Sequence, residues 1–220
     1  MRYRSVFDII GPIMVGPSSS HTAGAVRIGR MARQLFGRRP DRLTIEFFGS
    51  FAETYKGHGT DVAVVAGVLG FETFDARIPR ALVIAGVQGM AVTIDVQEAI
   101  PAHPNTVRLI LADRREEMSV TGISIGGGAI QIVDLNGFEL KLSGDNPAIL
   151  IMHQDVYGRI SAVADILTTH QINISHMEVS RKEKGKLALM VIETDQLVEQ
   201  SVLDQIRAQD HILRVLPVSL

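Results

Sequence analysis

The spacing of hydrophobic positions in the first 70 residues is typical of amphipathic helices. After Thr22, apolar residues recur every three or four positions, while Arg27, Arg30 and Arg33 fall on another face. A short run of alternating and apolar residues at 43–48 is typical of a strand instead. We therefore predict helices over residues 5–10, 22–36 and 60–69, with the strand 43–48 among them.

Alternation of apolar and polar residues replaces the helical spacing after residue 106. Runs at 107–111 and 118–124 are separated by charged residues, and Asn136-Gly137 joins runs 131–135 and 138–142 as a typical two-residue hairpin turn. This pattern predicts an antiparallel meander, so the first domain is expected to be a mixed α/β fold. Gly126–Gly128 interrupts the meander without a phosphate-loop lysine; we interpret it as a turn or bulge, with a phosphate cradle as the alternative.

A cluster of turn-forming residues at 143–147, Ser-Gly-Asp-Asn-Pro, predicts a domain boundary between residues 1–144 and 147–220. Beyond it the patterns follow the order βαββαβ, which is the order of a ferredoxin-like domain. The predicted segments are 148–152, 160–167, 174–181, 187–192, 198–206 and 212–218.

Composition narrows the classes of function. The 220 residues carry 22 basic and 24 acidic side chains, a net charge of −2, which gives no general attraction to nucleic acid or anionic membranes. The N-terminal residues do not resemble a signal peptide and no apolar run approaches the roughly 20 residues of a membrane span, so we expect a cytoplasmic protein without membrane or nucleic-acid partners. The chain has no cysteine, which excludes disulfides, thiol nucleophiles and iron–sulfur ligation by this chain.

Residues 14–24, MVGPSSSHTAG, concentrate hydroxyl groups and a histidine just before the first long helix. At a helix N-terminus the first N–H groups lack intrahelical partners and the dipole is positive, so such a segment is suited to hold a carboxylate or phosphate. The candidate binding residues are Ser18, Ser19, Ser20, His21 and Thr22. The alternative is that Ser19, Ser20 or Thr22 is simply the N-cap.

A second histidine, His58, lies between Gly57 and Gly59 and also precedes a helix. The two glycines leave the ring uncovered and the backbone free to approach a ligand, so His58 is a candidate acid/base group. Thr60 and Asp61 are candidate N-caps and candidate substrate-binding residues. The alternative is a flexible surface loop with an incidental histidine.

Other chemistries find less support in the residues. A serine hydrolase would need a GxSxG turn, which the chain lacks. A zinc site built from residues 153, 155, 176 and 178 matches no spacing of a known metal motif, so no metal ligands are predicted. Pyridoxal chemistry would need a placed lysine, and only Lys56 lies near either histidine. His103, His170 and His211 fall in predicted turns or at element ends and are expected to be solvated.

The C-terminal pattern, with Asp155-Val156-Tyr157-Gly158 in the first βα turn and Ile172-Asn173-Ile174-Ser175 at the second strand, resembles an ACT domain. The resemblance implies pairing between subunits and binding of a small amino acid at this turn. The implied effector residues are Asp155, Tyr157, Gly158, Arg159 and Asn173. Tyr157 stands where such domains usually have proline, and places a bulky side chain at the expected ligand entrance.

Three motifs together extend the resemblance over nearly the whole chain: GPSSSHTAG at 16–24, GSFA at 49–52 followed by GHGTD at 57–61, and SIGGG at 124–128. With the ACT-like domain they resemble the beta chain of bacterial iron–sulfur-dependent L-serine dehydratases. The resemblance implies a separate alpha chain whose cysteines hold a [4Fe–4S] cluster, and conversion of L-serine to pyruvate and ammonia without pyridoxal phosphate. It implies that the cluster iron acts as a Lewis acid on the departing hydroxyl. In such a reaction residues 18–22 are suited to hold the serine carboxylate, and His58 is a candidate for an acid/base or orienting role in removal of the α-proton.

The first domain also resembles the anion-binding regulatory domain of some phosphoglycerate dehydrogenases. This keeps open a second hypothesis, in which the chain is a non-catalytic regulatory subunit that senses an anion and an amino acid.

Overall fold

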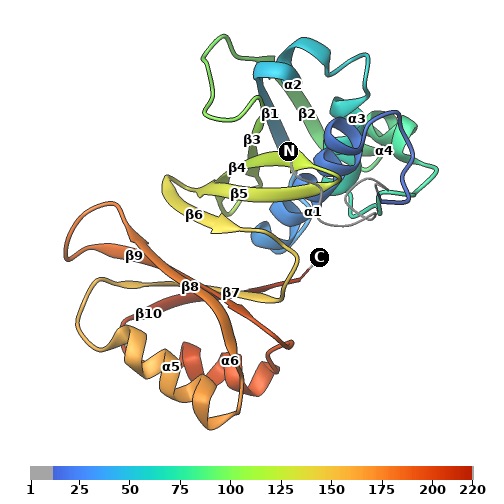
Figure 1. Cartoon of the computed structure of the whole chain (residues 1–220). Coiled ribbons are helices and arrows are strands. Elements are labelled where there is room, and N and C mark those ends of the chain that lie inside the picture. Colours follow the sequence, from blue (N-terminus) through green and yellow to red (C-terminus); the bar gives the residue numbers. More distant parts are fainter. Residues whose placement is uncertain (1–11, 220) are drawn as a thin grey trace. The chain divides into compact units, whose positions relative to one another are not determined.

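The computed structural model describes residues 12–219 and divides into two compact units, residues 1–136 and 137–220 (Figure 1). The expected helix over residues 5–10 lies outside the described residues. The mixed α/β class predicted for the chain is confirmed, and each unit is described below by itself.

A six-stranded mixed sheet has the order β2-β1-β3-β4-β5-β6. Strand β1 pairs in parallel with β2 (Leu43 beside Val92) and antiparallel with β3 (Leu43 beside Leu111), and β4 is antiparallel to both β3 and β5. The predicted meander is therefore confirmed. The strands from the first unit are β1 (Arg42–Phe48), β2 (Ala91–Val96), β3 (Asn105–Ala112), β4 (Glu117–Gly126) and β5 (Ala129–Leu135). The edge strand β6 (Phe138–Leu142) follows the hairpin turn and belongs to residues 137–220.

Helix α1 (Gly24–Phe36) packs on one face of this sheet, against β4 and β5 (Figure 1). Its apolar face is fully buried, as the periodicity predicts, and Ile28 fills the space over Gly122 of β4. Gly126, Gly127 and Gly128 all have positive φ in the β4–β5 connection, where the turn needs the left-handed region that glycine tolerates. The predicted turn at this position is confirmed.

Helix α3 (Thr60–Val68) crosses α1 at a pair of glycines. A Cβ atom on Gly67 would lie 2.1 Å from the carbonyl oxygen of Val26, and one on Gly29 would lie 2.3 Å from that of Val64. Because only glycine permits this approach, the two helix backbones touch directly. The residues just before each helix are thereby held in a fixed relation.

The remaining elements of the first unit show where the sequence pattern was insufficient. The helix expected from residue 22 is preceded by a π-helical turn, η2 (Ser19–Ala23), and α2 (Gly49–Thr54) forms at residues for which we predicted no element. The 3-10 turn η3 (Ile78–Arg80), helix α4 (Ala81–Val87) and strand β2 were not predicted. These elements are short, and β2 alternates only between half-buried and exposed residues, so the hydrophobic contrast that marks an element is weak.

In the second unit an antiparallel sheet of order β10-β7-β9-β8 is covered by two helices (Figure 1). Apolar residues of the sheet and both helices, including Ile151, Val163, Met190 and Ile206, form its core. The ferredoxin-like βαββαβ order is confirmed. The elements are β7 (Ala148–Gln154), α5 (Arg159–Thr169), β8 (Ile174–Arg181), β9 (Leu187–Thr194), α6 (Gln200–Arg207) and β10 (Ile212–Val218).

Among residues 12–219, no helix is both long enough and apolar enough to cross a membrane.

Candidate functional site

The serine-rich segment forms a capped helical N-terminus, and its cap is Ser18. The Ser18 hydroxyl accepts a hydrogen bond from the His21 N–H at 3.1 Å, and the Ser18 carbonyl accepts from the Thr22 N–H at 2.9 Å. The assignment of the cap to Ser19, Ser20 or Thr22 is therefore wrong, because the helical turn begins earlier than the apolar periodicity indicates. Ser19 and Ser20 lie in the first turn, where the described residues offer their N–H groups no acceptor.

This first turn is wider than an α-helical turn. The Gly24 N–H donates to the Ser19 carbonyl, five residues back, which is the π-helical pattern. Gly24 also lies against β4, because a Cβ there would be 2.2 Å from the Ser124 hydroxyl. The glycine therefore lets the buried Ser124 reach the base of the turn.

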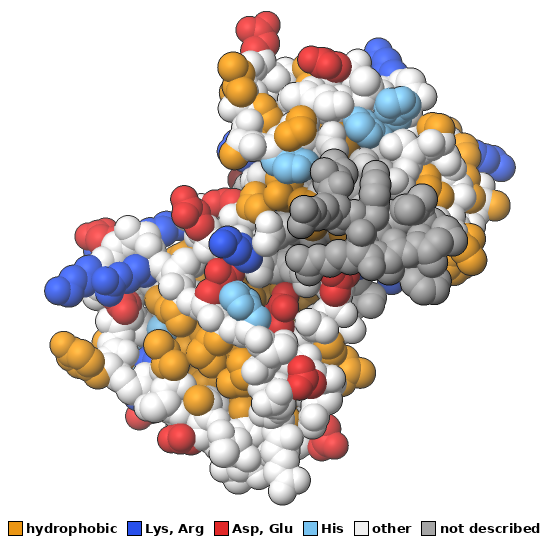
Figure 2. Space-filling view, in the orientation of Figure 1, with side chains coloured by type: hydrophobic (Ala, Val, Ile, Leu, Met, Phe, Trp, Pro, Cys, Tyr) orange, Lys and Arg blue, Asp and Glu red, His pale blue; other side chains and the backbone are white. Residues whose placement is uncertain are grey.

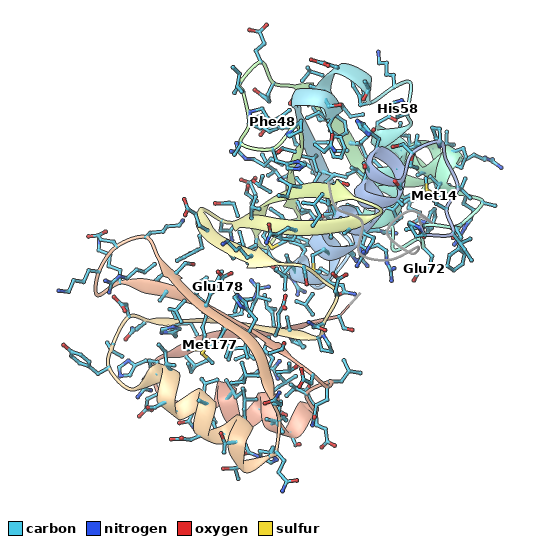
Figure 3. The ribbon with its side chains drawn as sticks, in the orientation of Figure 1. Met14, Phe48, His58, Glu72, Met177 and Glu178 are labelled. Carbon is cyan, nitrogen blue, oxygen red and sulfur yellow. The ribbon has the colours of Figure 1, made fainter. Side chains whose placement is uncertain are left out.

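The second histidine is presented by the short connection between α2 and α3, where Figure 3 labels it. The His58 N–H donates to the Thr54 carbonyl at 3.0 Å, and Gly59 follows in the left-handed region at φ 63°. Gly59 is the N-cap residue of α3, so the expected capping by Thr60 or Asp61 is wrong. Thr60 is already helical and its N–H donates to the Tyr55 carbonyl at 2.8 Å, while the Asp61 carboxylate accepts from the Val62 N–H at 2.8 Å.

The two histidines meet, although 36 residues separate them in the chain. Their ring centroids are 4.8 Å apart in an edge-to-face arrangement, and the Thr22 hydroxyl donates to the His58 carbonyl at 3.2 Å. On its other side the His21 ring lies edge-on to Phe51, 5.1 Å between centroids. The crossing of α1 and α3 therefore brings both predicted histidine segments into one site.

His21 is fixed by hydroxyl groups from two elements. Its Nε2 lies 3.1 Å from the Ser50 hydroxyl of α2, and its Nδ1 lies 3.4 Å from the Ser18 hydroxyl. Partial burial, followed by the neighbouring His58, lowers the pKa of His21 below its ordinary value of 6.5. The pair is thus arranged to hold His21 neutral near pH 7.

Three buried polar atoms around these residues have no hydrogen-bond partner among the described residues: His58 Nδ1, Thr60 Oγ1 and Ser124 Oγ. Thr60 and Ser124 are fully buried. Unsatisfied buried polar groups are uncommon, since each one costs about 1–3 kcal/mol. Their concentration beside a helix N-terminus is typical of a site that a polar ligand completes.

Sequence reasoning missed two residues of this site, Ser50 and Ser124. Both lie next to glycines in the sequence, in Gly49-Ser50 and Ser124-Ile125-Gly126. This proximity to glycine is the sequence feature that could have identified them as site residues. Conversely, the Asp61 side chain is engaged with its own backbone neighbour rather than with His21 or His58.

In the second unit a pocket of about 650 Å³ forms at the turn between β7 and α5. Four of the predicted effector residues line it: Asp155, Tyr157, Gly158 and Arg159. Asn173 does not line this pocket, and its side-chain amide donates to the Asp195 carboxylate at 2.6 Å. Asn173 directly precedes β8, and its role as an effector residue stays a prediction.

Charge and exposure define this second pocket further. The Gly185 N–H, and then the Arg181 guanidinium, hold the pKa of Asp155 below its usual range. His153 lines the pocket, and its buried Nε2 has no partner among the described residues. Tyr157 is fully exposed, so its ring extends from the turn instead of filling the pocket.

The histidines expected to be solvated lie outside both sites. His170 and His211 are exposed and contact Gln205 and Gln154, while His103 is half-buried and accepts from the Asn105 N–H at 3.2 Å. Within residues 12–219 no group of three or more His, Asp or Glu side chains is placed to hold a metal ion.

Comparison with known proteins shows which family combines these features. Residues 5–84 match the family model described as serine dehydratase beta chain, and residues 148–211 match the ACT domain. Over 219 residues the chain is 56% identical to the probable L-serine dehydratase beta chain of Bacillus subtilis, covering 100% of both proteins. The chain belongs to the L-serine dehydratase beta-chain family. The resemblance inferred from the three motifs and the C-terminal pattern is confirmed.

Two further relatives are similar to this chain, one of them a beta chain and the other a different enzyme. The L-serine dehydratase beta chain of Peptoniphilus asaccharolyticus is 37% identical over 202 residues, 90% of each chain. A D-3-phosphoglycerate dehydrogenase of Synechocystis is 27% identical over 184 residues, which are 83% of this chain and 33% of that protein. This chain is therefore also similar to part of a D-3-phosphoglycerate dehydrogenase, in line with the resemblance noted for the first domain.

Proposed function

We propose that this chain is the beta subunit of a two-chain L-serine dehydratase, and that it contributes substrate-binding and proton-transfer groups to an active site completed by an alpha chain. The observation that carries the proposal is the contact between His21 and His58 at a serine-rich helix N-terminus. The identity to beta chains over the full length supports it.

The first task of this chain is to hold the serine carboxylate. The Ser19 and Ser20 N–H groups lie at the positive end of the helical segment without acceptors among the described residues, and half-buried hydroxyls surround them. A carboxylate placed here would receive charge-assisted hydrogen bonds, each contributing about 1.5–3 kcal/mol. His21, held neutral, adds a donor or acceptor without a competing charge.

The second task is removal of the α-proton, which we assign to His58. Its Nδ1 is buried without a partner among the described residues, so a lone pair on this atom is not used by the fold. The backbone of His58 is fixed by the Thr54 carbonyl and the Thr22 hydroxyl, which positions the ring against His21. An imidazole nitrogen that the fold leaves without a partner is suited to act as a general base.

The proposed [4Fe–4S] cluster belongs to the alpha chain. This chain has no cysteine, so its residues do not fit a thiolate-ligated cluster, and we assign departure of the β-hydroxyl to the partner. The proposal includes neither a metal ligand nor pyridoxal phosphate in this chain.

The decisive experiment is anaerobic reconstitution with the cognate alpha chain, followed by serine deamination measured with and without this chain. His58→Ala is expected to lower kcat by at least about 100-fold while cluster absorbance and subunit association remain, since general acid–base groups contribute about 10²–10⁴ in rate. His21→Ala is expected to act more on KM. His170→Ala, at an exposed position outside the site, is the matched control.

Two outcomes would contradict this assignment. Normal kcat in the His58 variant would move the proton transfer to the alpha chain. Full activity of the alpha chain alone would favour the second hypothesis, in which this chain is a regulatory subunit sensing an anion and an amino acid.

For the ACT domain we propose pairing with a second copy and binding of a small amino acid at the β7–α5 turn. The pocket lined by Asp155 and the N-terminus of α5 offers a partner for an ammonium group and one for a carboxylate. Titration calorimetry of the full chain with L-serine, compared between wild type and Asp155→Asn, tests the binding. Sedimentation of both proteins tests the pairing. A domain that only dimerises would sediment as a dimer and would give no heat of binding in the calorimetric titration.

A further inference from the structure

A groove separate from the histidine site lies between α2 and the loop that connects β2 to β3. It encloses about 610 Å³, and its walls include Gly49, Ala52, Val96, Ile100 and Pro101. Figure 2 shows hydrophobic and acidic side chains next to one another over this part of the first unit. We call it the α2 groove.

The α2 groove is held open by the backbone at both ends of the loop. At one end the Gln97 N–H donates to the Phe47 carbonyl at 2.9 Å, and at the other the Pro104 carbonyl accepts from the Ser50 N–H at 2.8 Å. Gly49 packs against Pro104 so closely that a Cβ would lie 2.6 Å from the Pro104 carbonyl oxygen. The walls are therefore fixed relative to each other, as a preformed binding surface requires.

Large aliphatic side chains of the α2 groove face solvent. Ile100, in the loop, is 98% exposed, and Val96, the last residue of β2, is 51% exposed. A contiguous exposed apolar surface beside a formed groove is typical of a protein interface.

The rim of the α2 groove is acidic. Glu53 and Glu98 line it, and neither forms an ion pair with any of the described residues. A second copy of this chain is a poor occupant, because a twofold interface would set the same acidic rim against itself. The charge instead favours an occupant with Lys or Arg beside an aliphatic anchor.

Ser50 connects the α2 groove to the histidine site, although Ser50 itself does not line the groove. Ser50 donates its N–H to the loop that forms the groove, and its hydroxyl lies 3.1 Å from His21 Nε2. A protein that binds the groove therefore contacts the element that positions His21. This is the place from which a second chain could complete the site.

We propose that the α2 groove is a docking site for the alpha chain, occupied by a segment of that chain that inserts an aliphatic side chain flanked by Lys or Arg. The inference rests on the proposed function, since it names the surface through which the two chains assemble. It adds that assembly and the placement of His21 are coupled through Ser50.

The test measures the affinity of the full chain for the alpha chain by biolayer interferometry. Ile100→Ser, and separately the pair Glu53→Lys and Glu98→Lys, are expected to raise Kd by at least about tenfold, as loss of a central anchor does. The charge variant should also lose the salt dependence of association. Two controls lie in the same unit outside the groove, Val87→Ser at an 85% exposed position and Glu117→Lys at an exposed one, and both should bind like wild type.

The outcomes separate the inference from the proposed function. If wild-type chains associate and deaminate serine but the groove variants, folded by circular dichroism, bind with unchanged affinity, the docking inference is wrong and the proposed function stands. If the wild-type chain does not associate with the alpha chain at all, both the proposed function and this inference are wrong. A change in self-association alone, seen by sedimentation, would assign the groove to a second copy and overturn the inference.

Discussion

Substitution of Gly67 by alanine tests whether the crossing of α1 and α3 holds the site together. The new Cβ would lie 2.1 Å from the Val26 carbonyl oxygen and 2.8 Å from the Arg30 nitrogen. Both are backbone atoms, so no side chain can rotate away, and the helices must separate by about 1 Å to restore ordinary contact.

The expected effect on stability follows from two opposing contributions. Alanine improves helix propensity by about 1 kcal/mol, whereas overpacking typically costs about 1–3 kcal/mol and occasionally more. Because the contact involves two fixed backbones, we expect overpacking to dominate with a net loss of about 2 kcal/mol. For a chain of this length, that loss lowers Tm by about 4–8 °C.

The same substitution is expected to reduce activity. Helix α1 follows directly after the turn that carries His21, and α3 begins two residues after His58, so separating the helices widens the histidine pair. A misplacement of about 1 Å in an active site can cost about 100-fold in rate. The assay is serine deamination by the complex reconstituted with the alpha chain, together with calorimetric melting of this chain.

Gly86→Ala provides the matched control, because Gly86 also lies in a helix but a Cβ there would meet no atom within 4 Å. This variant should melt at or slightly above the wild-type temperature and retain activity. If Gly67→Ala melts as high as Gly86→Ala and turns over serine normally, the reasoning about the helix crossing is refuted.

Three further predictions concern the site. Ser18→Ala should cost about 1 kcal/mol of unfolding free energy by loss of the helix cap, whereas Ser19→Ala should leave Tm unchanged and raise KM for serine. The folded-state pKa of His21 lies below the ordinary value of 6.5. As the pH falls through 6.5, the unfolded chain therefore binds the proton first and the folded state loses stability. His21→Gln should reduce this loss of Tm with falling pH, and an unchanged loss would contradict the prediction. The isolated chain, purified anaerobically, should be colourless and inactive because it has no cysteine; iron–sulfur absorbance with serine turnover would contradict this.

Much of the fold was predictable because strong periodicity coincides with burial. The apolar face of 24–36, the hairpin turn at Asn136-Gly137 and the order of the ACT domain all follow from local patterns that the tertiary structure satisfies. The segment from 70 to 104 was not predictable, since its short elements expose much of their surface and show little contrast between faces. The N-caps were also wrong, because a π-helical turn and a left-handed Gly59 begin the helices at positions that periodicity does not reveal.

The sequence by itself determined the chemistry available to this protein: two histidines in glycine- and serine-rich segments before helices, no thiol, and the βαββαβ order of an ACT domain. Only the tertiary structure decided that His21 and His58 share one site, that Ser50 and Ser124 join it, and that Asn173 does not line the turn pocket. The physical reason is that local patterns specify elements, whereas the distance between residues far apart in the chain depends on packing. Here that packing is the contact of two glycines, Gly29 and Gly67, which lets α1 and α3 touch and places both histidine segments side by side.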